Sequence, residues 1–213
     1  MIRDTSLKVL LAGKNEIAVF GLRALLARLD KKNISVICNS TDEGYDTWQP
    51  SLKKLATEHE VTIMSLDECY EIENLVFISL EFDKIISPEK FATIHLYNIH
   101  FSALPAYKGM YTSALPLLNG DTESGVTLHK IDKGIDTGDI IDQIIFKIDK
   151  DENARDLYGK YLFHAKDLLE SNVDRILKCK LEIENLISFS IISVSFFKIV
   201  ESFNNIFFIE IWP

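Results

Sequence analysis

Lys8-Val-Leu-Leu-Ala-Gly13 and Ile34-Ser-Val-Ile-Cys38 are two short apolar runs that flank residues 14–33. Within that gap, residues 17–29 carry apolar side chains at helical spacing, which predicts a helix. A strand, a helix and a second strand in this order are typical of a βαβ unit, in which the two strands lie parallel. The pattern therefore indicates an α/β fold built on a parallel sheet.

The same alternation continues beyond residue 38. We expect further strands at residues 61–64, 75–79, 93–98, 125–131 and 140–148, and helical segments at residues 46–59, 66–73, 88–91, 111–118 and 153–178. The predicted fold class is α/β: a Rossmann-like open, mostly parallel twisted sheet with helices on both faces, plus a short C-terminal β appendage.

Two domains are expected, with a boundary after the last long helix. Residues 1–180 form the catalytic α/β domain in this interpretation, and residues 181–213 form the appendage. From about Leu186, Ser alternates with apolar residues, which favours strands. Exposed apolar strands seek a partner, so the appendage is interpreted as dimerisation strands, with a degenerate tail as the alternative.

Composition excludes several classes of protein. The formal net charge is −9, which disfavours nucleic-acid binding because phosphate neutralisation requires clustered Lys and Arg. The three cysteines have no CxxC spacing, so we expect no metal site and a reducing cytoplasm. No apolar run approaches the roughly 20 residues of a membrane span, and no signal peptide is expected.

The chemistry is concentrated where the predicted strand at residues 93–98 ends. Asn98 and His100 are two residues apart, so on an extended backbone their side chains point the same way. An imidazole can accept a proton from an attacking amine, and an amide can donate to a developing oxyanion. Asp136, between Gly134 and Gly138, can orient the imidazole and stabilise its charged form. The alternative is a loop histidine that binds backbone and a turn aspartate.

The motif around these residues runs Asn98-Ile-His100-Phe-Ser102-Ala-Leu-Pro105-Ala-Tyr107-Lys108-Gly109, and continues as Asn119-Gly-Asp121, Gly125-Val-Thr-Leu-His-Lys-Ile-Asp132 and Gly134-Ile-Asp136-Thr-Gly138-Asp139. It resembles the 10-formyltetrahydrofolate-dependent formyltransferases. The resemblance covers about residues 7–178 as a fold, and it is most specific over residues 98–140.

This resemblance implies a reaction and roles. An amine attacks the formyl carbon on N10 of the folate, and tetrahydrofolate leaves, with no metal and no covalent intermediate. Asn98 corresponds to the oxyanion donor, His100 to the general base, and Asp136 to the partner of His100 and organiser of water. The resemblance further implies 10-formyltetrahydrofolate contacts at Glu81, Phe82, Asp83, Ile86, Ile135 and Asp136, with plain core packing as the alternative for Phe82 and Ile86.

The acceptor is expected to be a nucleotide-linked sugar. The segment at residues 108–113 looks like the enzymes that N-formylate dTDP-4-amino-4,6-dideoxyglucose in bacterial O-antigen (lipopolysaccharide) pathways. We expect this substrate to contact Lys14, Asn15, Lys108, Gly109, Met110, Tyr111 and Thr112. The expected partners are the sugar nucleotide, the folate and a second copy of the chain in a cytoplasmic homodimer, without nucleic acid or membrane.

Four alternatives stay open. The first is formylation of methionyl-tRNA, which the net charge of −9 disfavours. The second is formylation of glycinamide ribonucleotide. It is disfavoured because the turn at residues 13–16, after the first strand, lacks a Gly- and Ser-rich phosphate nest. Hydrolysis of the formyl folate by water is the third, and a catalytically impaired protein that binds folate or nucleotide is the fourth. A dinucleotide-dependent oxidoreductase is weaker still, because the chain has no GxGxxG.

Overall fold

The computed structural model describes residues 7–178 of the 213. The chain divides into two compact units, residues 1–174 and 175–213. The description below concerns the first of them. The appendage predicted at residues 181–213 lies outside the described residues, so the domain division and the dimerisation strands stay predictions.

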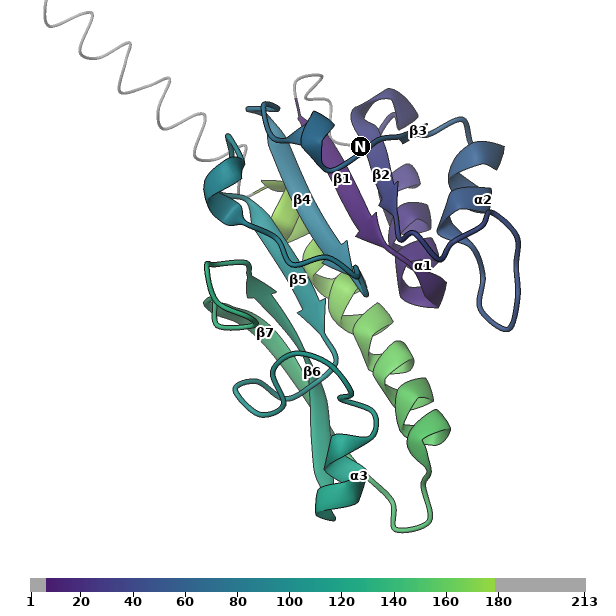
Figure 1. Cartoon of the computed structure of the whole chain (residues 1–213), viewed down its shortest axis with the longest axis vertical. Helices are drawn as coiled ribbons and strands as arrows, with labels where there is room; N and C mark the ends of the chain where they lie inside the picture. The colour runs from purple at the N-terminus through teal and green to yellow at the C-terminus, as the bar shows by residue number, and fades with distance from the viewer. Residues whose placement is uncertain (1–6, 179–213) are drawn as a thin grey trace, which may run out of the picture. The chain divides into compact units, whose positions relative to one another are not determined.

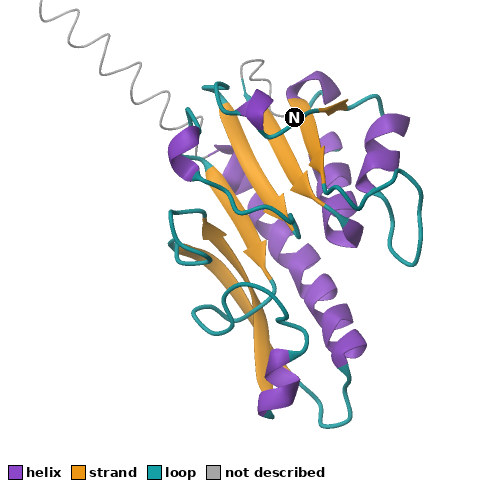
Figure 2. Ribbon diagram, in the orientation of Figure 1, coloured by secondary structure: helices purple, strands orange, loops and turns teal. Residues whose placement is uncertain are grey.

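A single seven-stranded sheet forms the centre of the first unit (Figures 1 and 2). The strand order is β3-β2-β1-β4-β5-β6-β7; β1 to β5 are parallel, whereas β6 and β7 run antiparallel. The strands are β1 (Lys8–Gly13), β2 (Ile34–Cys38), β3 (Thr62–Ile63), β4 (Leu75–Leu80), β5 (Leu96–His100), β6 (Glu123–Lys130) and β7 (Ile140–Lys147). The predicted mostly parallel, Rossmann-like fold class is confirmed.

The two faces of the sheet are covered differently. The α-helices are α1 (Asn15–Leu26), α2 (Leu52–Glu58), α3 (Leu115–Asn119) and a long helix at residues 154–178, and the 3₁₀ turns are η1 (Lys31–Asn33), η2 (Asp67–Cys69) and η3 (Pro88–Lys90). A methyl group at Gly21 of α1 would contact both Leu11 and Leu169, so α1 and the long helix share one face. On the other face, Leu10 and Phe77 pack with Cys69 of η2 in a separate apolar cluster.

Two predicted helices are shorter than expected, for local reasons. The helix predicted at residues 46–59 begins only at Leu52, because the Ser51 hydroxyl accepts the Lys54 amide and Ser51 in turn donates its own amide to Asp46. The helix predicted at residues 111–118 is reduced to α3, since Tyr111 has φ of 65° and no α-helix can include that conformation.

Two other segments also differ from prediction. The strand predicted at residues 93–98 is β5, Leu96–His100, because the Thr93 hydroxyl donates to the Leu75 carbonyl and accepts the His95 amide in a turn. The helix predicted at residues 66–73 contains only the 3₁₀ turn η2. The shift of β5 matters most, because it places His100 inside the strand instead of beyond it.

Gly13 permits the close approach of β1 and β4 at the edge where the site forms. A Cβ atom on Gly13 would lie 1.9 Å from the Leu80 carbonyl oxygen. We therefore expect Gly13→Ala to lower the free energy of unfolding by about 1–3 kcal/mol, the usual effect of overpacking, as measured by urea denaturation.

Gly159 in the long helix is the matched control for Gly13→Ala. A Cβ there meets nothing within 4 Å, so Gly159→Ala should raise the free energy of unfolding by about 1 kcal/mol through helix propensity. Equal effects of the two substitutions would contradict the steric argument.

Within residues 7–178, no helix combines the length and apolarity that crossing a membrane requires. Cytoplasmic localisation stays a prediction.

Candidate active site

The parallel strand β5 carries two of the predicted catalytic side chains to its carboxyl end. Loops beyond the carboxyl ends of parallel strands are where open α/β sheets bind ligands. In the antiparallel ladder with β6, Asn98 pairs with His129, and His100 pairs with Thr127. Directly paired residues present their side chains on the same face, so the ladder brings His129 beside Asn98.

Asp136 comes from the loop between β6 and β7 and meets both side chains of β5. Its Oδ2 lies 3.4 Å from His100 Nδ1 and accepts the backbone amide of Gly109 at 2.8 Å. Its Oδ1 accepts a hydrogen bond from Asn98 Nδ2 at 3.3 Å and lies 3.4 Å from His129 Nε2. The structure thus brings together Asn98, His100 and Asp136, as the sequence predicted, and adds a second imidazole.

The loop that presents Asp136 is tightly folded. Asp136 has φ of 51°, and a Cβ on Gly138 would lie 1.9 Å from the Lys130 carbonyl oxygen. Asp132 Oδ1 accepts from the Gly134 amide and from the Thr137 hydroxyl, which closes the turn before Asp136. Left-handed backbone at non-glycine residues is costly and gathers at functional sites. Five of the six such residues between 7 and 178 lie at the start of α1 or in the loops that follow β4, β5 and β6: Asn15, Glu81, Tyr107, Tyr111 and Asp136.

The proton positions on His100 follow from its neighbours. Nε2 lies 2.8 Å from the Tyr107 carbonyl oxygen, which can only accept, so Nε2 carries a hydrogen. In the neutral ring Nδ1 then has the free lone pair, and this atom faces Asp136. His100 is therefore oriented as a base whose charged form a carboxylate stabilises.

The surroundings of His100 and Asp136 determine the protonation state of each side chain. Burial lowers the pKa of His100 below its ordinary 6.5, and the nearby Asp136 carboxylate and Tyr107 carbonyl oppose this only in part. Burial alone would raise the pKa of Asp136, but the neighbouring His129 and His100 side chains and the hydrogen bond from the Gly109 amide bring it below 3.8. Near neutral pH the site therefore holds a neutral imidazole beside an ionised carboxylate.

His129 is the site residue that the sequence analysis did not single out. Its Nδ1 lies 2.7 Å from the Lys130 carbonyl oxygen, so Nδ1 carries the hydrogen and Nε2 accepts from Asn98 Nδ2 at 3.1 Å. That contact fixes which end of the Asn98 amide points to Asp136. A signal was present in the sequence, because His129 belongs to the quoted motif, but only the β5–β6 register places it opposite Asn98.

We expect His129 to act as a positioning residue, with an effect on kcat that can be distinguished from an effect on folding. We expect His129→Leu to lower kcat by about 10²-fold, because the Asn98 amide loses its orientation, with little change in folate affinity. His129→Gln should recover most of kcat, since its Oε1 can accept from Asn98 in the same place. Equal kcat for His129→Leu and wild type, or failure of Gln to recover activity in a folded variant, would contradict this role.

The residues predicted to bind folate separate into two groups. Ile86 is 8% exposed and packs in the apolar cluster around Leu10, and Phe82 packs against the same cluster. These two follow the core-packing alternative. Ile135 is 54% exposed beside Asp136, and Asp83 is also exposed. Ile85, which the sequence analysis passed over, is 77% exposed and is the apolar side chain of its loop that can meet a flat ring.

Glu81 faces away from those residues, toward the β1–α1 loop. Its carboxylate accepts from the Tyr158 hydroxyl at 3.0 Å and from Asn15 Nδ2 at 3.4 Å. Burial raises the pKa of Glu81, and the two hydrogen bonds oppose that shift. Glu81 thus ties Asn15 to the long helix, and its contact with folate stays a prediction.

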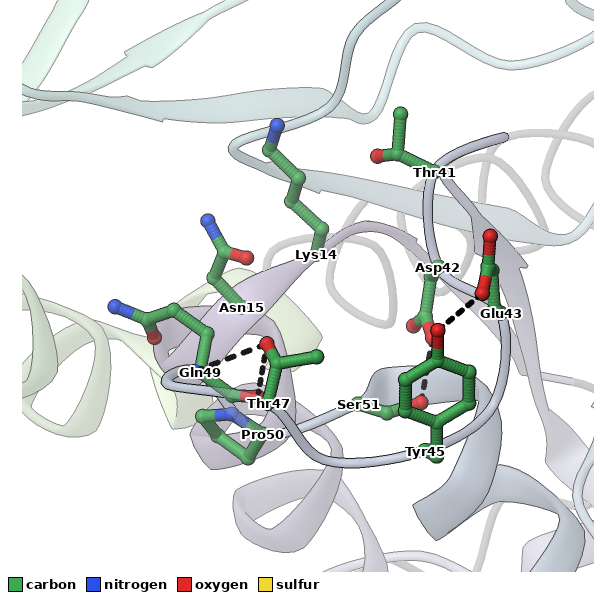
Figure 3. A pocket seen from close by; sticks show the side chains of 10 residues that line it. All are labelled: Lys14, Asn15, Thr41, Asp42, Glu43, Tyr45, Thr47, Gln49, Pro50 and Ser51. Atoms are coloured by element: carbon green, nitrogen blue, oxygen red, sulfur yellow. Dashed lines mark hydrogen bonds between the residues drawn. The ribbon is translucent and has the colours of Figure 1, made fainter.

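The predicted substrate residues Lys14 and Asn15 line a pocket of about 210 Å³ at the carboxyl ends of β1 and β2 (Figure 3). Asp42 and Glu43 also line it, so the lining holds two carboxylates against the one ammonium of Lys14. This charge balance does not favour a diphosphate at Lys14.

The other predicted substrate residues belong to the loop before α3. The Gly109 amide donates to Asp136, while Met110 and Tyr111 are each 72% exposed. The Thr112 carbonyl accepts from the Tyr161 hydroxyl at 3.0 Å, and Lys108 is exposed. The loop therefore borders the Asn98–His100–Asp136 cluster through Gly109, and it presents the exposed side chains of Lys108, Met110 and Tyr111 beyond it.

Among residues 7–178, no group of three or more His, Cys, Asp or Glu side chains is arranged to hold a metal ion.

The cluster thus combines a neutral imidazole, an ionised carboxylate and an amide at the edge of an open, mostly parallel sheet, a set of groups that is chemically suited to acyl transfer. By sequence, the chain belongs to the formyl transferase family, whose model matches residues 51–173.

Solved structures give closer relatives. The N-formyltransferase of Helicobacter canadensis, in complex with folinic acid and dTDP-3-aminofucose, is 47% identical with a TM-score of 0.80, over 82% of this chain and 65% of that one. WlaRD, a sugar 3N-formyl transferase solved in the presence of dTDP and 5-N-formyl-THF, is 49% identical with a TM-score of 0.81, over 83% and 65%.

Among curated proteins, the bifunctional polymyxin resistance protein ArnA of Wigglesworthia glossinidia brevipalpis is 29% identical over 187 residues, which cover 82% of this chain and 28% of that protein. The chain thus spans less than two thirds of the length of each of these three relatives.

Proposed function

We propose that this chain is an N-formyltransferase that moves a formyl group from N10-formyltetrahydrofolate to the amine of a dTDP-linked amino sugar. The observation that carries the proposal is the contact of Asp136 with both Asn98 and His100, in a chain of the formyl transferase family. The ligands of the two similar solved structures, a reduced formyl folate and a dTDP compound, support the same pair of substrates.

The proposed reaction forms one C–N bond and breaks another. The acceptor amine attacks the formyl carbon, and negative charge develops on the formyl oxygen. Both N–H groups of Asn98 have partners, His129 at 3.1 Å and Asp136 at 3.3 Å, so the formyl oxygen is proposed to take the N–H that otherwise binds Asp136. His100 Nδ1 accepts the proton of the amine beside the Asp136 carboxylate. That proton passes to N10 as the old C–N bond breaks and tetrahydrofolate leaves.

The folate is proposed to lie over the loop tips at the end of β4 and before Asp136. Ile85 and Ile135 offer exposed apolar surface there. A pterin ring needs such walls together with a few polar contacts, which the exposed Asp83 can supply.

The position of the acceptor amine divides the proposal in two. One similar solved structure contains dTDP-3-aminofucose and the other is described as a sugar 3N-formyl transferase, and this favours a 3-amino acceptor. The 4-amino-4,6-dideoxy sugar expected from the motif at residues 108–113 is the second candidate.

We further propose, as the sequence suggested, a cytoplasmic homodimer that serves O-antigen sugar synthesis. Size-exclusion chromatography with light scattering tests the dimer.

The test is a coupled assay of the full chain with N10-formyltetrahydrofolate and either the 3-amino or the 4-amino dTDP-sugar. Mass spectrometry of the sugar and absorbance of released tetrahydrofolate are followed together. Formylated sugar in step with tetrahydrofolate supports the proposal. Tetrahydrofolate release without an amine would instead identify a hydrolase, and folate binding without any turnover would identify a binding protein.

A further inference from the structure

The sequence motif contains a turn, Asn119-Gly120-Asp121, that the roles assigned in the candidate active site leave unused. Gly120 has φ of 71° and ends α3, as left-handed glycines commonly do at the ends of helices. This helix end uses only the backbone amides of Gly120 and Asp121, which donate to carbonyls of α3. It therefore explains the glycine and leaves the polar side chains of Asn119 and Asp121 unexplained.

Both of these side chains bind the hydroxyl of Tyr107. The hydroxyl donates its hydrogen to Asp121 Oδ2, and it accepts a hydrogen bond from Asn119 Nδ2 at 2.8 Å. A phenol oxygen with one donor and one acceptor partner has a fixed orientation. The bond to Asp121 raises the pKa of Tyr107 above its ordinary 10, so the phenol keeps its hydrogen near neutral pH. We call these two contacts the Tyr107 clamp.

The backbone of Tyr107 holds the proposed general base. Its carbonyl oxygen lies 2.8 Å from His100 Nε2. Tyr107 has φ of 52°, a left-handed conformation that is unfavourable for a bulky side chain. Such a conformation persists only where surrounding contacts hold it in place. The Tyr107 clamp supplies contacts of this kind, because it fixes the side chain of the same residue.

Two acceptors compete for the single ring hydrogen of neutral His100. The Tyr107 carbonyl lies 2.8 Å from Nε2, and Asp136 Oδ2 lies 3.4 Å from Nδ1. Charged acceptors form the stronger hydrogen bonds at equal geometry. The hydrogen therefore stays on Nε2 because the carbonyl is closer. If the carbonyl moved away, the hydrogen would pass to Nδ1, and Nδ1 could then accept no proton from an amine.

We propose that Asn119 and Asp121 are positioning residues for formyl transfer, which act by clamping Tyr107 so that its carbonyl keeps the ring hydrogen of His100 on Nε2. This inference rests on the proposed function, because it assumes that His100 accepts the proton of the amine. Neither Asn119 nor Asp121 belongs to the Asn98–His100–Asp136 cluster. Their effect on the reaction passes through Tyr107 and then through the ring of His100.

Nitrogen-15 NMR of the His100 ring reads the position of this hydrogen without ligands or turnover. The spectra are recorded on the full chain well above pH 6.5, where the ring is neutral, and the signals are assigned by their loss in His100→Ala. In the wild type the hydrogen should be on Nε2. Asp121→Ala should shift the ring toward the form with hydrogen on Nδ1. Asp121→Asn should restore the wild-type form, because an amide oxygen can accept from the Tyr107 hydroxyl.

Turnover gives an independent measure of the Tyr107 clamp. Asp121→Ala and Tyr107→Phe should each lower kcat by about 10²-fold, the usual effect of a misplaced catalytic group, with little change in KM for the folate. Both substitutions break the same contact, so the double variant should lose no more activity than either single variant.

Matched controls come from the same chain. Tyr70→Phe removes a phenol hydroxyl from a side chain that packs against the apolar cluster around Leu10. Asp151→Ala removes an exposed carboxylate from the turn between β7 and the long helix. Neither substitution should change kcat or the position of the His100 hydrogen, and circular dichroism reports whether each variant is folded.

The outcomes decide this inference separately from the proposed function. A folded Asp121→Ala variant with the hydrogen still on Nε2 overturns the inference, whether or not kcat falls. A wild-type ring with its hydrogen on Nδ1 also overturns it, as do additive losses in the double variant. A shift of the hydrogen to Nδ1 in Asp121→Ala, with recovery in Asp121→Asn, supports the clamp even if the wild type transfers no formyl group, in which case only the proposed function fails.

Discussion

His100→Ala should lower kcat by about 10²–10⁴-fold, the range for loss of a general base, while folate binding is retained. The reason is geometric. His100 is held by the Tyr107 carbonyl at Nε2, so its free lone pair is at Nδ1, the atom that lies beside Asp136 and that is proposed to accept the amine proton. No other imidazole among residues 7–178 can replace it there, because both nitrogens of His129 have partners.

The measurement for His100→Ala is single-turnover formyl transfer, with folate affinity followed by fluorescence. His59→Ala is the matched control, because His59 is exposed at the end of α2 and should not change kcat. Full turnover in a folded His100→Ala variant would refute the general-base role.

Asp136→Asn should lower kcat about as much as His100→Ala, because the Asp136 carboxylate contacts four neighbouring groups. It faces His100 and His129 and accepts from Asn98 and from the Gly109 amide. An amide in its place cannot stabilise imidazolium. Replacing a carboxylate that supports a catalytic histidine has lowered kcat by about 10⁴-fold in a serine protease, and we expect about 10²–10⁴-fold here.

The pH profile distinguishes this electrostatic role from simple disruption. In the wild type His100 must be neutral, so kcat/KM should fall as pH drops through its pKa, which lies below 6.5. Asp136 raises the pKa of His100 against the effect of burial. Removing its charge therefore moves the acidic limb to still lower pH. An unchanged limb, or one shifted upward, would contradict the assignment.

Asp67→Asn is the matched control for this experiment. Asp67 is exposed in η2, which precedes β4, and its substitution changes the same net charge without touching the cluster. It should leave the acidic limb of the pH profile in place.

The sequence was sufficient for the architecture because local patterns encode it. Apolar runs such as Lys8–Gly13 become strands, and a parallel order follows from the helices between them. The first and last residues of the helices and strands were less predictable, because each end depends on a single interaction. The Thr93 hydroxyl delays the start of β5, and the left-handed Tyr111 shortens α3.

The sequence by itself determined the chemical identity of the site, because Asn98 and His100 lie two residues apart on one strand and Asp136 belongs to the same motif. Tertiary structure decided what surrounds them. The β5–β6 register places His129 against Asn98, and the long helix brings the Tyr161 hydroxyl to the Thr112 carbonyl, 49 residues earlier in the chain. Strand pairing and loop anchoring depend on contacts between distant segments, and no local pattern of side chains records such contacts.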